Sequence, residues 1–313
     1  MTKTVYILSD SLNYSKLICD DAGPGYAALM GWDCINLADH QNMFNYDIAV
    51  VDNRIQENEL DLLKQVIESN SSIPFFLKIV DPFYENRGHP YYNFLTGMAG
   101  WNNVYLLSVY QATELAEEIG KLYNNRFITI PYPYIKSKEV NNTTGRKSKI
   151  LLSGAINKVY YPYRYAIWQK ITRNLARLFF TILRHPGYVE LDDTLAPEHS
   201  IIKDEYIAYL SKFKYMLLCP GRCNIEFMKF NECAYAGCIP VGLPPNSYPE
   251  DIKNLFLKLR LSNFYSDLLS IFLAKNKSHS VKKLRDYLSK THDPNLLNAH
   301  LIAFVNENSI HTS

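Results

Sequence analysis

The sequence predicts an α/β protein with two Rossmann-like, doubly wound domains that face a cleft. Three observations indicate this class. Short apolar runs alternate with helical stretches, and the alternation restarts in the second half of the chain. The apolar runs lack polar alternation, as expected of strands that a parallel sheet buries on both faces. The length of 313 residues is typical of two domains.

The first half supplies one domain, predicted to span residues 1–135. Its strand candidates are residues 4–8, 33–37, 48–51, 75–80, 104–107 and 127–130. Helices are predicted between them, at residues 57–69 and 112–123. A polar stretch at 136–149, which follows two prolines and ends in basic residues, is the predicted linker.

The second half repeats the pattern over residues 150–275. Its predicted elements are, in order, a strand at 150–152, a helix at 163–175, a strand at 179–183, a helix at 202–213, a strand at 215–219, a helix at 224–236 and a strand at 238–241. Residues 276–313 are predicted to be helical, because Val281, Leu284 and Leu288 form an apolar stripe.

Composition narrows the class of protein. The chain is 47% hydrophobic and 20% charged, and no apolar run approaches 18 residues. The N-terminus is too short and too polar for a signal peptide, so a cytoplasmic protein is expected. Residues 1–140 hold 10 Lys/Arg and 17 Asp/Glu, a net charge of −7, whereas residues 141–313 hold 23 and 14, a net charge of +9. A basic second half suits a polyanion such as a nucleotide diphosphate, although ordinary solvated faces would give the same counts.

The most informative segment is residues 215–245, which read YMLLCPGRCNIEFMKFNECAYAGCIPVGLPP. An apolar strand is followed by a Pro-Gly turn, a helix and a second apolar strand. Within the predicted helix, Lys229 and Glu232 share one face, while Phe230 and Ala234 lie opposite. A turn and helix start after a parallel strand is where such sheets bind anions and nucleotides.

This segment resembles the donor-binding segment of GT-B glycosyltransferases, in particular the exostosin-like and spore-protein-like branches (glycosyltransferase group 1). The resemblance rests on Cys219-Pro220, Gly221, Lys229, Glu232 and the run AGCIPV at 236–241. It implies that Glu232 binds the ribose hydroxyls of a nucleotide sugar. It also implies that the turn and the basic residue face the phosphates, and that C-terminal helices can pack back on the first domain.

Each candidate donor-binding residue has an alternative role. One carboxylate can accept from both ribose hydroxyls, but Glu232 could instead form an i,i+3 surface pair with Lys229. Lys229 and Arg222 would stabilise the leaving diphosphate, with backbone N–H groups of residues 220–225; a solvated lysine is the alternative.

A second group of candidates follows the first two strands of the second domain. The resemblance implies that Gly154 allows close approach of the donor and that an arginine lies in the next helix, here Arg164. An arginine at a helix start opposes the macrodipole unless an anion is near. His185 is predicted either beside the nucleobase or in a plain turn.

No metal site and no cofactor are expected beyond the nucleotide sugar as cosubstrate. Asp-x-Asp does not follow any predicted strand, and Asp192-Asp193 and Asp20-Asp21 are adjacent pairs without that spacing. The cysteines form no CxxC pair, and no nearby histidine completes a site at Cys219-x3-Cys223.

The catalytic base is expected from strand ends of the first domain. The candidates are Asp81, Asp10 and His89; Asp52 also follows a predicted strand, and Glu85 lies in the same loop as Asp81 and His89. Each could equally be a helix cap or turn residue. The retaining GT-B pattern separates two glutamates by eight positions, whereas Glu226 and Glu232 are six apart, so retention is not favoured.

The sequence therefore predicts a metal-independent glycosyltransferase of carbohydrate biosynthesis. It would move a hexose or pentose from a nucleotide sugar to a hydroxyl of a glycan, lipid or small molecule. Three alternatives remain: a nucleotide-sugar 2-epimerase, a non-catalytic nucleotide-sugar-binding protein and a DNA-modifying glucosyltransferase. Nucleic acid is not the expected partner, because no dense basic tract with interleaved aromatics occurs.

Overall fold

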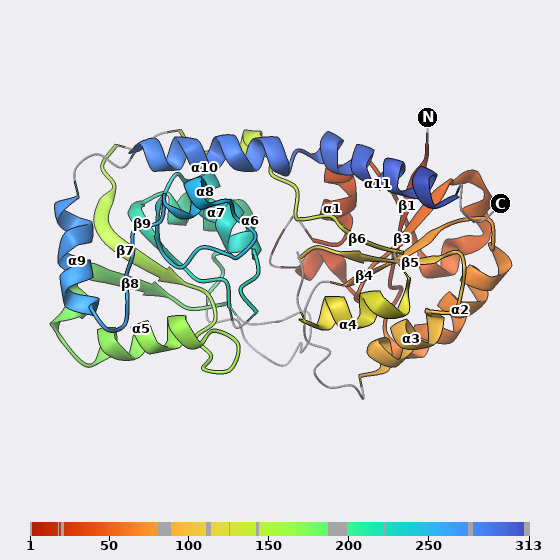
Figure 1. Ribbon diagram of the computed structural model, residues 1–313, viewed down its shortest axis with the longest axis horizontal. Helices are drawn as coiled ribbons and strands as arrows, with labels where there is room; N and C mark the ends of the chain where they lie inside the picture. The colour runs from red at the N-terminus through yellow and green to blue at the C-terminus, as the bar shows by residue number, and fades with distance from the viewer. Residues whose placement is uncertain are drawn as a thin grey trace. The chain divides into compact units, whose positions relative to one another are not determined.

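The chain forms two units, one comprising Met1–Pro133 with His292–Ser313 and the other comprising Tyr134–Thr291 (Figure 1). The computed structural model describes residues 2–17, 19, 22–79, 89–110, 114–124, 126–141, 144–186, 199–221, 223–274 and 278–309. None of the helices that these residues form has both the length and the apolar character needed to cross a membrane.

The first unit contains a parallel sheet of six described strands in the order β2-β1-β3-β4-β5-β6. Every residue of β1, β3, β4 and β5 is buried, which explains why these runs show no polar alternation. The strands are β1 (Thr4–Leu8), β2 (Asp33–Asn36), β3 (Ile48–Val51), β4 (Phe75–Ile79), β5 (Val104–Ser108) and β6 (Phe127–Thr129).

Helices cover both faces of this sheet. One face packs on α2, α3, α4 and η2 through a single apolar cluster. On the other face, Phe304 of α11 lies 6.2 Å from Phe76 and 6.1 Å from Tyr105 between ring centroids, and α11 contacts α1. The helices are η1 (Tyr14–Lys16), α1 (Pro24–Met30), η2 (Leu37–Asn45), η3 (Glu57–Glu59), α2 (Leu60–Ser69), α3 (Pro90–Met98), α4 (Glu114–Leu122) and α11 (Pro294–Ser309).

The second unit contains a parallel sheet of four described strands in the order β10-β9-β7-β8. Helices α5 and α9 share an apolar cluster with one face, and α6, α7, α8 and α10 share another with the opposite face. The elements are η4 (Lys136–Lys138), β7 (Lys147–Ser153), α5 (Pro162–Thr172), η5 (Leu175–Phe179), β8 (Phe180–Leu183), α6 (Lys203–Leu210), β9 (Phe213–Leu218), α7 (Met228–Ala236), β10 (Ile239–Gly242), α8 (Glu250–Lys253), α9 (Phe264–Leu273) and α10 (Ser278–Thr291).

In each sheet, the second and third strands in chain order lie on opposite sides of the first strand, so the direction of winding reverses there. The chain moves outward from β1 to β2 and then returns to β3 on the other side of β1; it does the same from β7 to β8 and then β9. Doubly wound sheets bind ligands outside the carboxyl ends of their strands at such a switch point. The two switch points are therefore the places where function is expected.

The predicted fold class is confirmed: the protein is α/β, with two parallel sheets covered by helices. Three helix boundaries were wrong. The helices predicted at 163–175 and 202–213 end at Thr172 and Leu210, and the third error is the start of α7. The helix predicted from residue 224 begins at Met228, because Asn224 has a left-handed φ of +53° that an α-helix does not accept.

Candidate functional site

The switch point of the second unit lies where β7 ends at Ser153 and Gly154 follows. Gly154 has a φ of +98°, a conformation that side chains other than glycine rarely adopt. A Cβ at this position would lie 3.1 Å from Nη1 of Arg164 and 3.3 Å from Cε of Lys229. The glycine therefore lets two cationic side chains approach the end of the strand.

Arg164 lies in the first turn of α5 and is only 2% exposed. Its Nη1 donates a hydrogen bond to the Ala155 carbonyl at 3.0 Å, and its guanidinium carbon lies 4.4 Å from the ring centroid of Tyr161. Its Nε makes no hydrogen bond to any described residue. An unsatisfied buried N–H is costly, so this atom would gain from an anionic acceptor.

Lys229 lies in the first turn of α7, and its side chain is 23% exposed. Its Nζ lies 2.9 Å from Oε2 of Glu232 and donates to the Tyr206 hydroxyl at 2.7 Å. The Tyr206 hydroxyl also shares a hydrogen bond with Oγ of Ser153. Burial alone would lower the pKa of Lys229, but Glu232 and Tyr206 raise it above its ordinary value, so the ammonium is retained.

Glu232 therefore forms the i,i+3 ion pair that was one of its two predicted roles. Its side chain is 14% exposed, and the pair holds Lys229 beside the strand end. The ribose-binding role of Glu232 stays a prediction. Tyr206 was missed by sequence reasoning, because nothing in the predicted helix distinguished it from the chain's many other tyrosines.

His185 follows β8 and lies close to the same cations. Burial, together with the positive charges of Lys229, His199 and Arg164, lowers the pKa of His185 to about 4. Its imidazole is therefore neutral at pH 7 and adds no positive charge to the group. The structure thus brings together Gly154, Arg164, His185, Lys229 and Glu232, five of the seven predicted donor-binding residues.

The turn after β9 carries the other two. Gly221 has a φ of +68°, and a Cβ there would lie 2.7 Å from a ring carbon of Phe227, so the tight turn requires glycine. Arg222 lies outside the described residues. The Ile225 N–H donates to the Pro220 carbonyl at 3.0 Å inside this loop, which corrects the expectation that it faces a phosphate.

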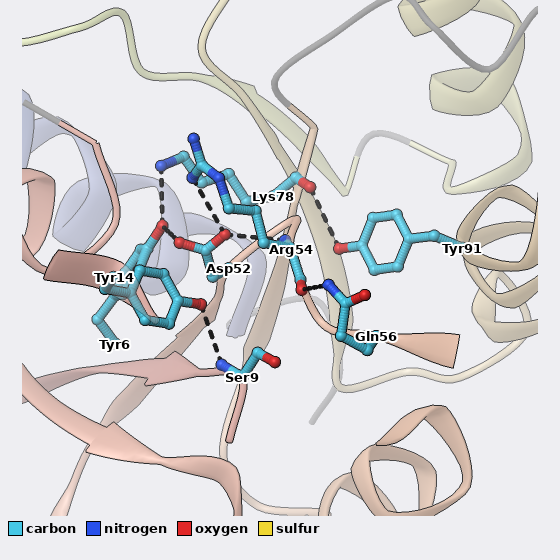
Figure 2. Close-up of polar contacts among 8 residues, drawn as sticks. All are labelled: Tyr6, Ser9, Tyr14, Asp52, Arg54, Gln56, Lys78 and Tyr91. Carbon is cyan, nitrogen blue, oxygen red and sulfur yellow. Dashed lines mark hydrogen bonds and ion pairs between the residues drawn. The ribbon is translucent and has the colours of Figure 1, made fainter. Parts of the chain in front are cut away.

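The switch point of the first unit contains a buried polar network (Figure 2). Asp52 follows β3 and is 0% exposed. Its Oδ2 accepts from the Tyr6 hydroxyl at 2.9 Å, and its Oδ1 accepts from the Arg54 backbone N–H at 2.8 Å. The Arg54 guanidinium lies 3.5 Å from the same Oδ1. Because both carboxylate oxygens are engaged and inaccessible, Asp52 has the environment of a structural residue.

Lys78, in β4, completes this network. It is 1% exposed, and its Nζ donates to the Tyr6 hydroxyl at 2.8 Å and lies 3.8 Å from the ring centroid of Tyr26. Burial outweighs the attraction of Asp52 and lowers the pKa of Lys78 to about 7. Sequence reasoning missed this residue. The available signal was a lysine inside an otherwise apolar run, FFLKI.

The predicted bases occupy capping positions where they are described. Oδ2 of Asp10 accepts from the Ala38 N–H at 2.9 Å, and the Asp10 N–H donates to Glu59 at 2.7 Å. Nδ1 of His89 accepts from the Tyr91 N–H at 3.2 Å at the start of α3. The side chains of Asp10 and His89 are nevertheless exposed to solvent while they form these hydrogen bonds. Asp81 and Glu85 lie outside the described residues.

The described part of the chain contains no cluster of three or more His, Cys, Asp or Glu side chains that could hold a metal ion. Asp192-Asp193 lies outside it. At the second switch point, Arg164 and Lys229 are cationic side chains that lie against Gly154.

Comparison with known proteins gives similarity at the level of fold. No family model and no curated protein match the chain. HepE of Anabaena in complex with UDP-glucose has a TM-score of 0.62 at 6% identity, covering 98% of this chain and 100% of that chain. The DNA-modifying enzyme β-glucosyltransferase has a TM-score of 0.56 at 9% identity, covering 97% and 100%.

An α-glucosyltransferase in complex with UDP and a 13-mer DNA containing an HMU base has a TM-score of 0.52 at 8% identity, covering 97% of this chain and 99% of that chain. At such low identities these likenesses show the fold alone. That fold is the GT-B fold of glycosyltransferases, as the sequence resemblance implied.

Proposed function

We propose that the protein is a glycosyltransferase that binds the diphosphate of a nucleotide sugar at the switch point of its second unit. The observation that carries the proposal is the placement of Arg164 and Lys229 against Gly154, at the end of β7. Solved structures of the same fold hold UDP or UDP-glucose, which supports a nucleotide sugar as the donor.

The proposed reaction needs positive charge at this place. The acceptor hydroxyl attacks the anomeric carbon, the bond from that carbon to the β-phosphate oxygen breaks, and a nucleoside diphosphate leaves. The hydroxyl proton passes to a base. Negative charge grows on the leaving phosphate, and preorganised cations stabilise it in the transition state. Arg164 and Lys229 would supply that charge without a metal ion.

Lys229 is positioned for this role by its neighbours. Glu232 and Tyr206 fix its ammonium in the protonated form, and Ser153 fixes Tyr206 in turn. Glu232 would contact the ribose as well as Lys229. The base is proposed in the first unit, with Asp81, Asp10 and His89 as candidates.

Donor binding tests the proposal with a matched control. Lys229→Ala should weaken binding of the cognate nucleotide sugar by about 1.5–3 kcal/mol in calorimetry, because a charged partner of the phosphates is lost. Lys253→Ala should leave affinity unchanged: Lys253 also forms an i,i+3 pair, 3.0 Å from Glu250, but in α8, outside the proposed donor site. Equal affinities for the two variants would remove Lys229 from the donor site.

Turnover separates this function from its rivals. Transfer of sugar to an added acceptor identifies a transferase, whereas formation of a 2-epimer without acceptor identifies an epimerase. Binding with neither product identifies a non-catalytic protein. DNA is a second candidate acceptor, favoured by a DNA-modifying β-glucosyltransferase and an α-glucosyltransferase in complex with DNA that share the fold, and DNA containing HMU tests it directly.

A further inference from the structure

Large apolar side chains are exposed together on the second unit. On α9, Tyr265, Leu269 and Leu273 are 61%, 62% and 69% exposed, and they follow one another at helical spacing. On η5, Leu175 and Leu178 are 74% and 61% exposed. We call these five residues the α9 patch. Exposed apolar clusters of this kind mark surfaces that contact a partner or a membrane.

The patch rests on a rigid support. Oδ1 of Asn174 accepts from the Ala176 N–H at 2.9 Å at the start of η5, and Ala176 and Phe180 are buried in the core. The ring of Phe179 lies 5.1 Å from that of Phe272 on α9, which joins the two halves of the patch. The leucines are therefore held outward by a packed turn and a packed helix.

A hollow of about 550 Å³ adjoins the patch, between the end of α5 and the turn before α9. Lys170 and Arg173 line it on one side, and Leu261 and Tyr265 line it on the other. Lys170 is held there with its Nζ 5.7 Å from the ring centroid of Phe264. The hollow thus combines two cations with an apolar rim, which suits an anionic group attached to an apolar body.

The surrounding charge has one sign. Residues 140–189, which include α5 and η5, contain nine Lys/Arg and no Asp or Glu. On α9, the sole acidic residue is Asp267, and it accepts from Nε and Nη2 of Arg260 at 2.9 and 2.6 Å. No carboxylate of α5, η5 or α9 is therefore left to offset Lys170 and Arg173.

We propose that the α9 patch binds the surface of an anionic phospholipid bilayer. Leu175, Leu178 and Leu269 would enter the interface, and a headgroup phosphate would lie in the hollow with Lys170 and Arg173. A second copy of the chain fits less well, because a two-fold contact brings the same positive surfaces together. Nucleic acid would satisfy the cations but leave the leucines unpaired with apolar surface. The proposal does not depend on glycosyl transfer.

Cosedimentation of the full chain with vesicles tests it. The wild type should bind vesicles of phosphatidylcholine mixed with phosphatidylglycerol and should not bind pure phosphatidylcholine. Leu178→Ser combined with Leu269→Ser should lower the partition coefficient by about tenfold or more. Arg173→Glu should lower it by about fivefold or more. Leu296→Ser, at a 57% exposed leucine on α11, is the matched control and should bind as the wild type does.

Melting curves of each variant by circular dichroism establish that it is folded. Failure of the wild type to bind, or equal binding to both kinds of vesicle, would overturn the proposal. Retention by duplex DNA in place of vesicles would assign the surface to nucleic acid. A dimer in light scattering that Leu269→Ser converts to monomer would assign it to a second copy.

Discussion

Lys78 should make the stability of the first unit depend on pH in a direction opposite to that of an ordinary surface lysine pair. The test is replacement by methionine, which keeps the length of the side chain and removes the charge. Lys78 faces Tyr6, Tyr26, Asp52 and Arg54, and among the described residues only the phenol of Tyr6 forms a hydrogen bond with its Nζ. Lys78→Met leaves the bond between Tyr6 and Asp52 in place.

The magnitude follows from the shift in pKa. Burial lowers the pKa of Lys78 from 10.5 to about 7, so between these values the unfolded chain holds a proton that the folded chain lacks. Unfolding then takes up a proton, and the free energy of unfolding rises with pH across this window. Between pH 6 and pH 9 the wild type should gain about 2–3 kcal/mol relative to Lys78→Met.

Urea unfolding at pH 6, 7, 8 and 9 measures this difference. Trp168 belongs to the second unit, so a Trp168→Phe background leaves Trp32 and Trp101 to report on the first unit by fluorescence. Lys121→Met, at an exposed residue of α4, controls for the loss of a charge. If wild type and Lys78→Met differ by the same amount at pH 6 and pH 9, Lys78 does not lose its proton in the folded state and the reasoning is refuted.

Three further predictions concern the proposed reaction. Glu232→Ala should weaken nucleotide-sugar binding by about 1–3 kcal/mol, and unchanged affinity of the folded variant in calorimetry would remove Glu232 from the site. Turnover should survive EDTA, because side-chain cations take the role of a metal; activity lost in EDTA and restored by magnesium or manganese would contradict this. Asp81→Asn, or failing that Asp10→Asn, should lower turnover by about 100-fold with donor affinity unchanged, and near-normal turnover in both would place the base elsewhere. Asp52→Asn should instead lower the urea midpoint of the first unit, since it removes charge from a buried network.

The strands could be predicted from the sequence because a parallel sheet buries both faces. The runs that form β1, β3, β4 and β9 are short and apolar almost throughout, which is typical of strands in a parallel sheet. The start of α7 could not be predicted, because it depends on the left-handed Asn224 and on a loop bond to Pro220. Periodicity continues across such a turn even though the helix does not.

The residues of the two sites also divide into those that could be predicted from the sequence and those that could not. Lys229 and Glu232 could be proposed because a linear motif carries them, and Gly154 because it follows the first predicted strand of the second domain. Tyr206 and Lys78 act through contacts with Ser153 and Tyr6, which lie 53 and 72 residues away in the chain. Such contacts leave no local pattern, so only the folded structure shows them.

The two switch points differ in the charged and polar groups that remain accessible to a ligand. This difference is why we propose that the donor binds to the second unit. In the first unit, Asp52 and Lys78 are inaccessible, and both oxygens of Asp52 accept hydrogen bonds within the unit. In the second unit, the side chain of Lys229 is 23% exposed, and Nε of Arg164 is buried without a hydrogen-bond acceptor. An anion placed there would satisfy Arg164 and neutralise charge that Glu232 balances only for Lys229. The cluster around Asp52 and Lys78 can therefore stabilise its own unit without a ligand. At the second switch point, the Lys229 ammonium and the Arg164 Nε–H can bind an anionic ligand.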